Sequence, residues 1–470
     1  MSEPERVGDL AIVLHSHMPY VEGFGTYPFG EEWLFDAVFR SYVPVLEAAD
    51  SLTFTVTPVL ADQLEAHGVP GRLRAFLREF RLGSAEAEAA DVSAELRPAC
   101  EAEAARYRAA LARLEDVGDD LLALFREPAS RGHVELMASA ATHAVLPLVA
   151  TAAGRRLQID AGLRSHRRRF GPSAGFWLPE CAYEVGIEAL LAERGVRCFC
   201  VDQSADEAPL GALTPVVTPA GPVALPIDWE AVQWLWSPQG YPSDAPHADS
   251  FRESGRGLRL WSVGGGPYDP QAAAARAREQ AAEFVSSIGE RLKRFRDDRG
   301  RPGILTFAID TELLGHWWRE GPEWLAEVVR LAAGHGVELV TVSDAIARHE
   351  PEARELHRFT WGEGKDLRTW DSPAVADMAW AARRLELRLL GALARGLDER
   401  RVLRAARELL AMQASDWAFL DGRREAGDYP FQRATDHAQA LLEALDGHRA
   451  PDPNLRHLAP DLNLAPLLEP

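Results

Sequence analysis

Residues 303–318 read GILTFAIDTELLGHWW, and they carry the most information about this chain. The apolar run 303–309 predicts a short buried strand. It leads into Asp310, Glu312, His316 and two tryptophans. In barrels of alternating strands and helices, the carboxyl ends of the strands carry the chemistry. The stretch therefore predicts a strand end in a sugar-binding site. The alternative is a capping Asp before a Trp-rich core helix, which is disfavoured because two adjacent tryptophans cannot both face one core.

A second stretch, GFWLPECAY at residues 175–183, has the same design. Pro179 fixes its own φ and biases Leu178 towards extended geometry, so Glu180 is expected at a strand end. Taken alone, a Glu that follows Pro is usually a solvated loop residue. The similar stretch around Asp310 makes a functional role for Glu180 the better interpretation. Two carboxylates on separate strands suit glycosidic bond chemistry, in which they lie about 5–5.5 Å apart when configuration is retained. Aromatic side chains such as Trp177 offer flat faces to sugar rings.

Histidines follow two further predicted strands. His15 and His17 come directly after the strand at 10–14, and alternation along an extended segment puts both on one face. Such a pair could bind a metal, donate hydrogen bonds to sugar hydroxyls, or be purely structural. His143 follows the strand at 134–138.

Six motifs occur in an order that resembles glycoside hydrolase family 57, in particular its 1,4-α-glucan branching enzymes. The resemblance extends from about residue 8 to about residue 440, and six motifs in family order are far more specific than any one of them. The motifs are HSHMPY (15–20), Thr142-His143, WLPE (177–180), DTELLGHWW (310–318), WGEG (361–364) and SDW (415–417).

The resemblance implies a distorted (β/α)7 TIM-like barrel in residues 1–350 and a C-terminal α-helical domain in residues 351–470. It implies a retaining mechanism without metal or organic cofactor, with Glu180 as nucleophile and Asp310 as acid/base. Because Asp310 must be protonated first, we expect its pKa to lie above that of Glu180. Substrate-binding roles are expected for His15, His17, His143, Trp177, Tyr241, Arg252, Trp261, Gly265, His316 and Trp317, and for Trp361, Trp370 and Asp416 of the C-terminal domain.

The pattern along the chain agrees with a barrel of strand–helix units. Residues 72–125 predict an inserted helical hairpin with disorder around 84–90, and the tail from residue 450 predicts an extended wrap or a loose end. Strands are predicted at 10–14, 53–58, 134–138, 174–178, 198–201, 258–263, 304–309 and 337–341, and C-terminal helices at 374–391, 399–415 and 432–447.

Residues 236–257 form a lid loop that is shorter than is usual in the family that the chain resembles. Pro238 and Pro242 flank Tyr241, so we expect its ring on a stiff turn rather than in the core, where it could cover the glycosyl intermediate. A short lid admits water, which leaves open an α-1,4-glucan hydrolase or a 4-α-glucanotransferase. From another class, a metal-dependent polysaccharide deacetylase remains an alternative, and it requires a full ligand set of histidine and carboxylate.

Composition constrains partners and location. The 470 residues carry a net charge of −20, which argues against nucleic acid and anionic membranes, whereas a neutral α-1,4-glucan imposes no charge requirement. There is no N-terminal signal region and no apolar run long enough to span a bilayer. Four cysteines, at 100, 181, 198 and 200, form no metal or disulfide pattern. We expect a cytoplasmic enzyme, as a monomer or small homo-oligomer.

Overall fold

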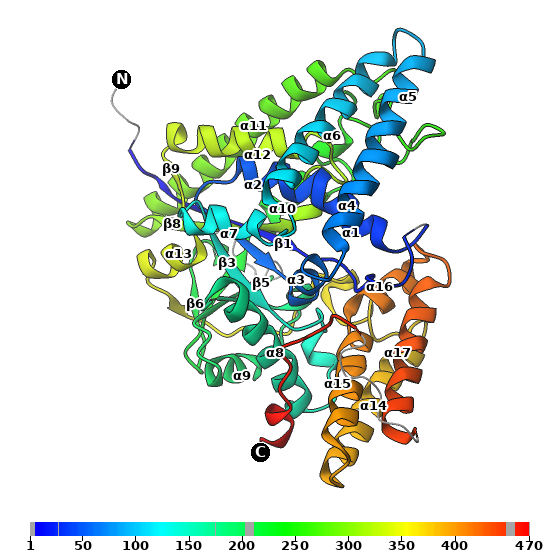
Figure 1. Cartoon of the computed structure of the whole chain (residues 1–470). Coiled ribbons are helices and arrows are strands. Elements are labelled where there is room, and N and C mark those ends of the chain that lie inside the picture. Colours follow the sequence, from blue (N-terminus) through cyan, green and yellow to red (C-terminus); the bar gives the residue numbers. More distant parts are fainter. Residues whose placement is uncertain (1–4, 27, 174, 203–210, 448–455, 470) are drawn as a thin grey trace.

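Seven parallel strands form a closed barrel in the computed structural model, which describes residues 5–26, 28–173, 175–202, 211–447 and 456–469 (Figure 1). β1 pairs with β2 on one side and β8 on the other, and β7 pairs with β8 to close the ring. The barrel strands are β1 (Gly8–Ser16), β2 (Leu52–Val56), β3 (Val134–Ser139), β4 (Gly175–Trp177), β5 (Cys198–Asp202), β7 (Val223–Ile227) and β8 (Gly303–Asp310). The expected barrel is confirmed.

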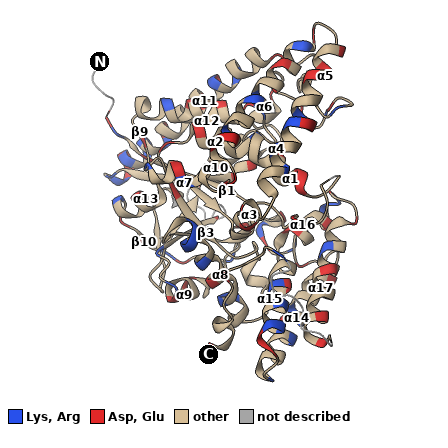
Figure 2. Ribbon diagram, in the orientation of Figure 1, with Lys and Arg blue, Asp and Glu red and all other residues tan. Residues whose placement is uncertain are grey.

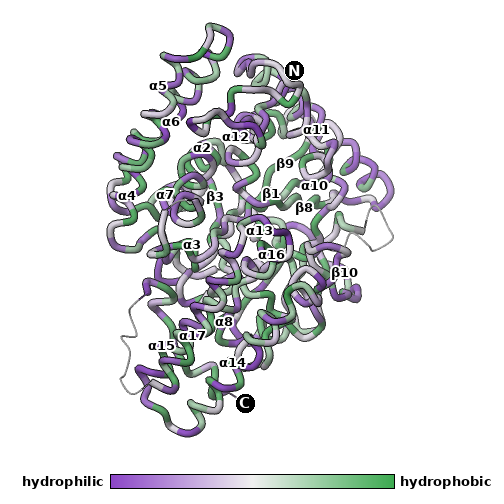
Figure 3. The backbone as a smooth tube through the Cα atoms, turned by 90° about the vertical axis from the view of Figure 1, so that its right-hand side faces the viewer, coloured by the Kyte–Doolittle hydropathy of each residue, from purple (hydrophilic) through white to green (hydrophobic). Residues whose placement is uncertain are grey.

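The strands are buried on both faces, which explains why they are apolar without interruption. Every residue of β1 and β2 is buried, as are residues 303–309 of β8. Figure 3 shows β1, β8 and β9 as a hydrophobic centre inside more polar helices. Seven of the eight expected strands are present, although residue 174 lies outside the described residues. The last, β9 (Val337–Leu339), pairs only with the start of β1.

The expected strand at 258–263 is wrong, and β7 takes its place in the barrel. Residues 258–263 form only isolated bridges, one from Ser262 to Ala248 and one from Trp261 to Pro267. Pro226 hid β7 in the sequence, since proline is rare in central strands. β7 pairs with β5 all the same, with Pro226 opposite Val201. Two short strands extend this side, β6 (Val216–Val217) antiparallel to β7, and β10 (Glu352–Ala353) beside β6.

Helices surround the barrel, and a long hairpin projects from it (Figure 1). The hairpin runs out through α4, a π-helical segment at Phe76–Leu82 and α5, and returns through α6. The expected disorder at 84–90 is wrong, because α5 is continuous and packs against α6. The helices before residue 350 are α1 (Glu31–Ala37), α2 (Val43–Ala48), α3 (Pro58–Leu64), α4 (Val69–Ala75), α5 (Gly83–Asp91), α6 (Arg97–Val117), α7 (Ala123–Ser130), α8 (Ala152–Phe170), α9 (Ile187–Glu193), α10 (Trp229–Trp236), α11 (Pro270–Arg299), α12 (Gly321–Leu331) and α13 (Val342–Arg348).

The C-terminal region is helical, and its hydrophobic core also includes Ala141 and, from α8, Leu157 and Ala161. Its helices are α14 (Ala376–Ala394), α15 (Glu399–Met412), α16 (Ser415–Arg423) and α17 (Tyr429–Asp446). The expected single helix at 399–415 is wrong at its end, because Ala414 is extended and pairs with Ala144, so that α16 starts afresh. The domain boundary near residue 350 stays a prediction.

The described part of the tail, residues 456–469, lies against the protein, as the expected wrap does. The Ala459 N–H donates to Asp62 Oδ2 at 2.7 Å, and Arg456 Nε pairs with Glu408 Oε1 at 2.9 Å. On the outer helices, acidic and basic side chains are interspersed (Figure 2). No helix within the described ranges combines the length and apolarity needed to cross a bilayer.

Close packing of α8 on the end of β3 gives a test of the fold. A Cβ added at Gly162 would lie 1.9 Å from the Ser139 carbonyl oxygen, and the Ser139 hydroxyl donates to the Trp177 carbonyl oxygen at 3.0 Å. We expect Gly162→Ala to destabilise the protein by about 1–3 kcal/mol, the usual cost of overpacking. Gly71→Ala is the matched control, since a Cβ on that exposed helical residue meets nothing within 4 Å. Thermal unfolding of both variants tests this expectation. Equal melting temperatures for Gly162→Ala and Gly71→Ala would contradict the packing described.

Candidate active site

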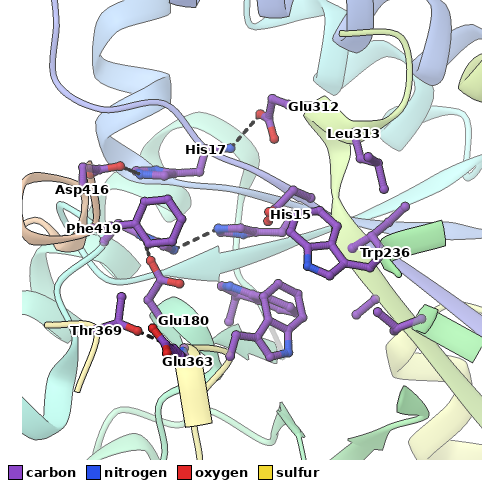
Figure 4. A pocket seen from close by; sticks show the side chains of 18 of the residues that line it. His15, His17, Glu180, Trp236, Glu312, Leu313, Glu363, Thr369, Asp416 and Phe419 are labelled. Atoms are coloured by element: carbon purple, nitrogen blue, oxygen red, sulfur yellow. Dashed lines mark hydrogen bonds and ion pairs between the residues drawn. The ribbon is translucent and has the colours of Figure 1, made fainter. Parts of the chain in front are cut away.

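A pocket opens at the carboxyl ends of the barrel strands, between the barrel and the C-terminal helices (Figure 4). Its walls come from β1, β4 and β8, from the segment around residues 361–370, and from α16. Ten of the fifteen predicted site residues line this one pocket. They are His15, His17, His143, Trp177, Glu180, Asp310, Trp317, Trp361, Trp370 and Asp416.

The two predicted catalytic carboxylates are held by different parts of the backbone. Asp310 ends β8, where it pairs with His15 of β1. Glu180 follows β4 with φ 58°, in the left-handed region that non-glycine residues seldom adopt. Its carbonyl accepts from the Trp361 N–H at 2.7 Å, and its Oε1 accepts from the Ser415 hydroxyl at 2.8 Å. His143, also in the pocket, has φ 60°. Such conformations persist where the surroundings impose them, and they concentrate at functional sites.

Both carboxyl groups titrate well above their ordinary range. Burial raises the pKa of Glu180 to about 7, against the hydrogen bond from Ser415, and the charges of Asp310 and Asp416 add to the increase. Burial raises the pKa of Asp310 to about 6, and the positive charge of His17 opposes it. The two pKa values lie close together, and the expected order stays a prediction. Glu180 faces the carboxylates Asp310 and Asp416 as well as His17, and Asp310 also faces His17.

His17 is the pocket histidine that most readily takes a positive charge (Figure 4). Its Nε2 lies 2.9 Å from Asp416 Oδ1, and its Nδ1 lies 3.1 Å from Thr57 Oγ1. Burial alone would lower the pKa of His17, but Asp416, together with Glu312 and Glu180, raises it above 6.5. This folded-state pKa exceeds that of the unfolded chain, so the protonation stabilises the fold fully below about pH 6.5 and is lost as pH rises through the folded pKa.

His15 and His143 are neutral neighbours of His17. Burial, and then the charge of His17, lower the pKa of each well below 6.5. Their Nε2 atoms lie 2.9 Å apart. His15 Nδ1 lies 2.5 Å from Thr55 Oγ1, and His143 Nδ1 lies 2.9 Å from Ser415 Oγ. Among the described residues, no group of three or more His, Cys, Asp and Glu side chains is arranged to hold a metal ion.

Several lining residues were not predicted as site residues. Burial and the charge of Asp310 raise the pKa of Glu312 to about 8, while Glu312 Oε1 accepts from the Tyr42 hydroxyl and the His17 N–H. The other missed lining residues include Trp229, Trp236, Glu363, Thr369, Phe419 and Arg423. A spacing of seven, which puts Trp229 and Trp236 on one face of α10, is a signal that could have revealed them.

Tyr241 does not stand on an exposed turn, so that expectation is wrong. Its side chain is 7% exposed and packs against Trp234 and Trp318, with ring centroids 5.5 and 6.4 Å away. The turn does occur, as a short 3-10 helix over Tyr241–Ser243. It directs the ring inward, because apolar surface is more stable away from water.

Four other expected site residues also lie outside the pocket. Arg252 stacks on Trp261, with its guanidinium carbon 4.3 Å from the ring centroid. Gly265 occupies an exposed turn at φ 88°, where a side chain is disfavoured. His316 is largely enclosed, and its carbonyl accepts from Arg259 Nη1 at 2.5 Å. These residues shape the lid and the turn before Trp317, whose own side chain is half exposed at the pocket.

The His17–Asp416 pair predicts a defined titration change. Asp416→Asn removes the closest negative charge while keeping a hydrogen-bond acceptor, so burial should dominate and the pKa of His17 should fall from above 6.5 to below it. Histidine NMR signals followed against pH measure this directly. The control is Asp50→Asn, which removes the carboxylate 3.0 Å from exposed His133 and should leave His17 unchanged. An unaltered His17 titration in Asp416→Asn would contradict the pairing.

Comparison with known proteins gives consistent results. The model of glycosyl hydrolase family 57 matches residues 11–225, and that of the 1,4-α-glucan branching enzyme C-terminal region matches residues 378–463. A 1,4-α-glucan branching enzyme of Thermococcus kodakarensis is 32% identical over 96% of this chain and 74% of its own length. The crystal structure of a GH57-type branching enzyme from Pyrococcus horikoshii superposes with a TM-score of 0.89 at 28% identity, over 98% of this chain and 97% of the other.

An α-amylase of Thermotoga maritima shares the fold, with a TM-score of 0.83 at 24% identity over 94% of this chain and 93% of the other. The fold alone therefore does not separate branching from hydrolysis. The overall identity to the Thermococcus branching enzyme and the match of the C-terminal region favour branching. This chain belongs to glycoside hydrolase family 57, among its 1,4-α-glucan branching enzymes.

Proposed function

We propose that this chain cuts α-1,4 bonds in a glucan and rejoins the cut end as an α-1,6 branch, by a retaining double displacement at Glu180 and Asp310. The observation that carries the proposal is the placement of both carboxyl groups in one pocket with stacked and edge-on aromatic rings. Trp177 and Trp361 meet edge to face at 5.1 Å, and Trp317 offers a half-exposed ring. Such rings suit the apolar faces of glucose units.

In the first step, the Glu180 carboxylate attacks the anomeric carbon and Asp310 donates its proton to the leaving oxygen. The C–O bond of the glycosidic link breaks, an ester to Glu180 forms, and the leaving chain departs with a free 4-hydroxyl. The Ser415 hydroxyl, bonded to Oε1, holds one carboxylate oxygen in place. His17, protonated beside Asp416, supports negative charge on the surrounding carboxylates.

In the second step, Asp310 removes the proton from the 6-hydroxyl of an acceptor chain, whose oxygen attacks the anomeric carbon. The ester breaks, Glu180 regains its charge, and Asp310 is protonated again for the next cycle. Trp361 and Trp370, nine residues apart, both line the pocket. We assign them to the chains on either side of the cut, as the family resemblance implies.

The two carboxyl groups must hold opposite protonation states in the productive complex, with Glu180 ionised and Asp310 protonated. Burial raises the pKa of both groups, to about 7 for Glu180 and about 6 for Asp310. A glycosidic oxygen that accepts from protonated Asp310 favours the productive form, because hydrogen bonding to the neutral acid stabilises it.

Hydrolysis is the nearest alternative, and the amylase with the same fold keeps it in view. Tyr241 is buried behind Trp234 and Trp318, so in this conformation it does not cover an intermediate. Exclusion of water falls instead to the residues at the rim, of which Trp236 and Trp317 are each about half exposed.

A metal-dependent deacetylase fits the histidines less well. All four ring nitrogens of His15 and His143 already lie within hydrogen-bond distance of Thr55, Ser415 or each other. A metal ion would have to displace these partners. Activity on amylose in the presence of a chelator distinguishes the glucan-active enzyme from the deacetylase, since the double displacement continues without a metal. We also propose a cytoplasmic location, which the burial of all four cysteines, none of them in a disulfide among the described residues, supports.

Loss of the nucleophile is the most direct test. Glu180→Gln keeps the size of the side chain but removes its charge, so cleavage of amylose should fall by about 10³-fold or more with the fold intact. Glu290→Gln, an exposed change on α11, is the matched control and should keep full activity. Near-normal cleavage by Glu180→Gln would assign the nucleophile elsewhere.

Product analysis distinguishes branching from hydrolysis. Incubation with amylose should create many α-1,6 linkages and few new reducing ends, because the anomeric carbon passes from the cleaved bond through the ester to the acceptor oxygen, and only attack by water turns it into a reducing end. A debranching assay counts the linkages, and a reducing-sugar assay counts the ends. Reducing ends in large excess over branches would make the chain a hydrolase of the same family.

The pH profile tests the role of Asp310. With pKa values of about 6 and about 7, wild-type kcat/KM should follow a narrow bell whose limbs belong to the coupled pair. Asp310→Asn leaves only the deprotonation of Glu180, so residual activity should rise with pH to a plateau. The remaining limb should also move to lower pH, since the neighbouring charge is gone. If the basic limb of the pH profile is preserved in Asp310→Asn, another group is the acid, and Glu312 is the next candidate.

A further inference from the structure

Four buried side chains and the partly exposed Glu180 form one continuous series of hydrogen bonds that ends on Glu180. Thr55 Oγ1 lies 2.5 Å from His15 Nδ1, and His15 Nε2 lies 2.9 Å from His143 Nε2. His143 Nδ1 lies 2.9 Å from Ser415 Oγ, which donates to Glu180 Oε1 at 2.8 Å. Three of the members come from β2, β1 and α16, and His143 and Glu180 follow β3 and β4.

The series has only one consistent direction when Glu180 is ionised. A carboxylate oxygen can only accept, so the Ser415 hydroxyl must donate to it and accept from His143 Nδ1–H. Neutral His143 then has a bare Nε2, which accepts from His15 Nε2–H. Neutral His15 has a bare Nδ1, which accepts from the Thr55 hydroxyl. The two histidines must therefore hold opposite tautomers.

We propose that this series is a directed hydrogen-bond chain in which Thr55 and Ser415 are positioning residues, fixing His15 as the Nε2–H tautomer, His143 as the Nδ1–H tautomer, and Glu180 in its attacking orientation. The part that concerns attack rests on the proposed role of Glu180 as nucleophile. The part that concerns tautomers depends only on Glu180 being the terminal acceptor.

The neighbouring histidine shows why the chain is specific. His17 also bonds a threonine of the adjoining segment, Thr57, but its Nε2 meets the Asp416 carboxylate instead of another imidazole. When His17 is protonated, both of its ring nitrogens donate hydrogen bonds, so the ring cannot fix the donor-to-acceptor direction of a hydrogen-bond chain. The charged groups that face Glu180 are Asp310 from β8, Asp416 from α16 and His17, which directly follows β1, and His143 Nδ1 lies 3.7 Å from Oε1. Within the described residues, the hydrogen bond to Oε1 comes from the Ser415 hydroxyl.

The test reads tautomers by NMR in protein with 15N-labelled histidine. At a pH well above the Glu180 pKa of about 7, where this carboxyl is ionised, the wild-type protein should show His15 protonated on Nε2 and His143 on Nδ1. The signals are assigned by their loss in His15→Asn and His143→Asn. Ser415→Ala removes the acceptor of His143 Nδ1–H, so His143 should lose the pure Nδ1–H form. Ser415→Thr keeps the hydroxyl and should restore it. Thr57→Val, outside the chain, should leave both tautomers unchanged.

Kinetics give the second readout. Ser415→Ala removes the hydrogen bond that favours ionised Glu180, so the pH profile of kcat/KM should shift upward, while Ser415→Thr keeps the wild-type profile. Thr55→Val should lower kcat by about tenfold without raising KM in proportion, since it disturbs orientation rather than binding. These expectations use far-UV circular dichroism to confirm that each variant is folded.

Specific results would overturn the proposal. The same tautomer in both histidines of the wild-type protein, or a charged ring in either at neutral pH, rules out the directed chain, and no variant is needed to see it. An unmoved pH profile in folded Ser415→Ala rules out the orientation of Glu180 by Ser415. Full activity of Glu180→Gln would instead remove the proposed function and leave the tautomer result standing.

Discussion

The ion pair between His17 and Asp416 is the constraint on which the arrangement of the pocket depends. Five carboxyl groups line the pocket, and all except the exposed Glu363 are largely enclosed: Glu180, Asp310, Glu312 and Asp416. Bringing these four together is electrostatically unfavourable unless some are protonated or a cation stands among them. His17 supplies that cation, and Asp416 keeps it charged against burial. The same charge lowers the pKa values of His15 and His143 and opposes the increase at Asp310. One protonated imidazole thus influences most of the titrating groups around it.

Two histidines at the end of one strand reach different charge states because their Nε2 atoms meet different partners. His15 lies in β1 and His17 directly follows it, and each bonds a threonine through Nδ1. His15 Nε2 meets the imidazole of His143, whereas His17 Nε2 meets the carboxylate of Asp416. Both of those partners depend on α16, since the Ser415 N–H donates to the His143 carbonyl and Asp416 is the next residue. The barrel provides the histidines, and the C-terminal helices decide their states.

Much of this could be predicted from sequence, because strand ends carry their chemistry in local patterns. The runs before His15, Glu180 and Asp310 are apolar and short, and the residues that follow them all reach the pocket. The errors came from contacts between distant segments. Pro226 concealed β7, which the neighbouring β5 and β8 nevertheless pair with. The break before Ser415 has no glycine or proline to announce it, and it exists because Ala414 pairs with Ala144. The prediction for Tyr241 in the lid was wrong for a related reason. Its packing against Trp234 and Trp318 cannot be inferred from the spacing of residues in the local sequence.

The position of α16 late in the chain has a consequence for how the protein is made. During synthesis, N-terminal segments leave the ribosome first, so β1 to β8 can fold before residues 415–423 exist. Such a barrel holds Glu180 without its serine and His17 without its counter-ion. It is therefore a poor catalyst until nearly nine-tenths of the 470 residues have been translated, when Ser415 and Asp416 dock beside His143 and His17.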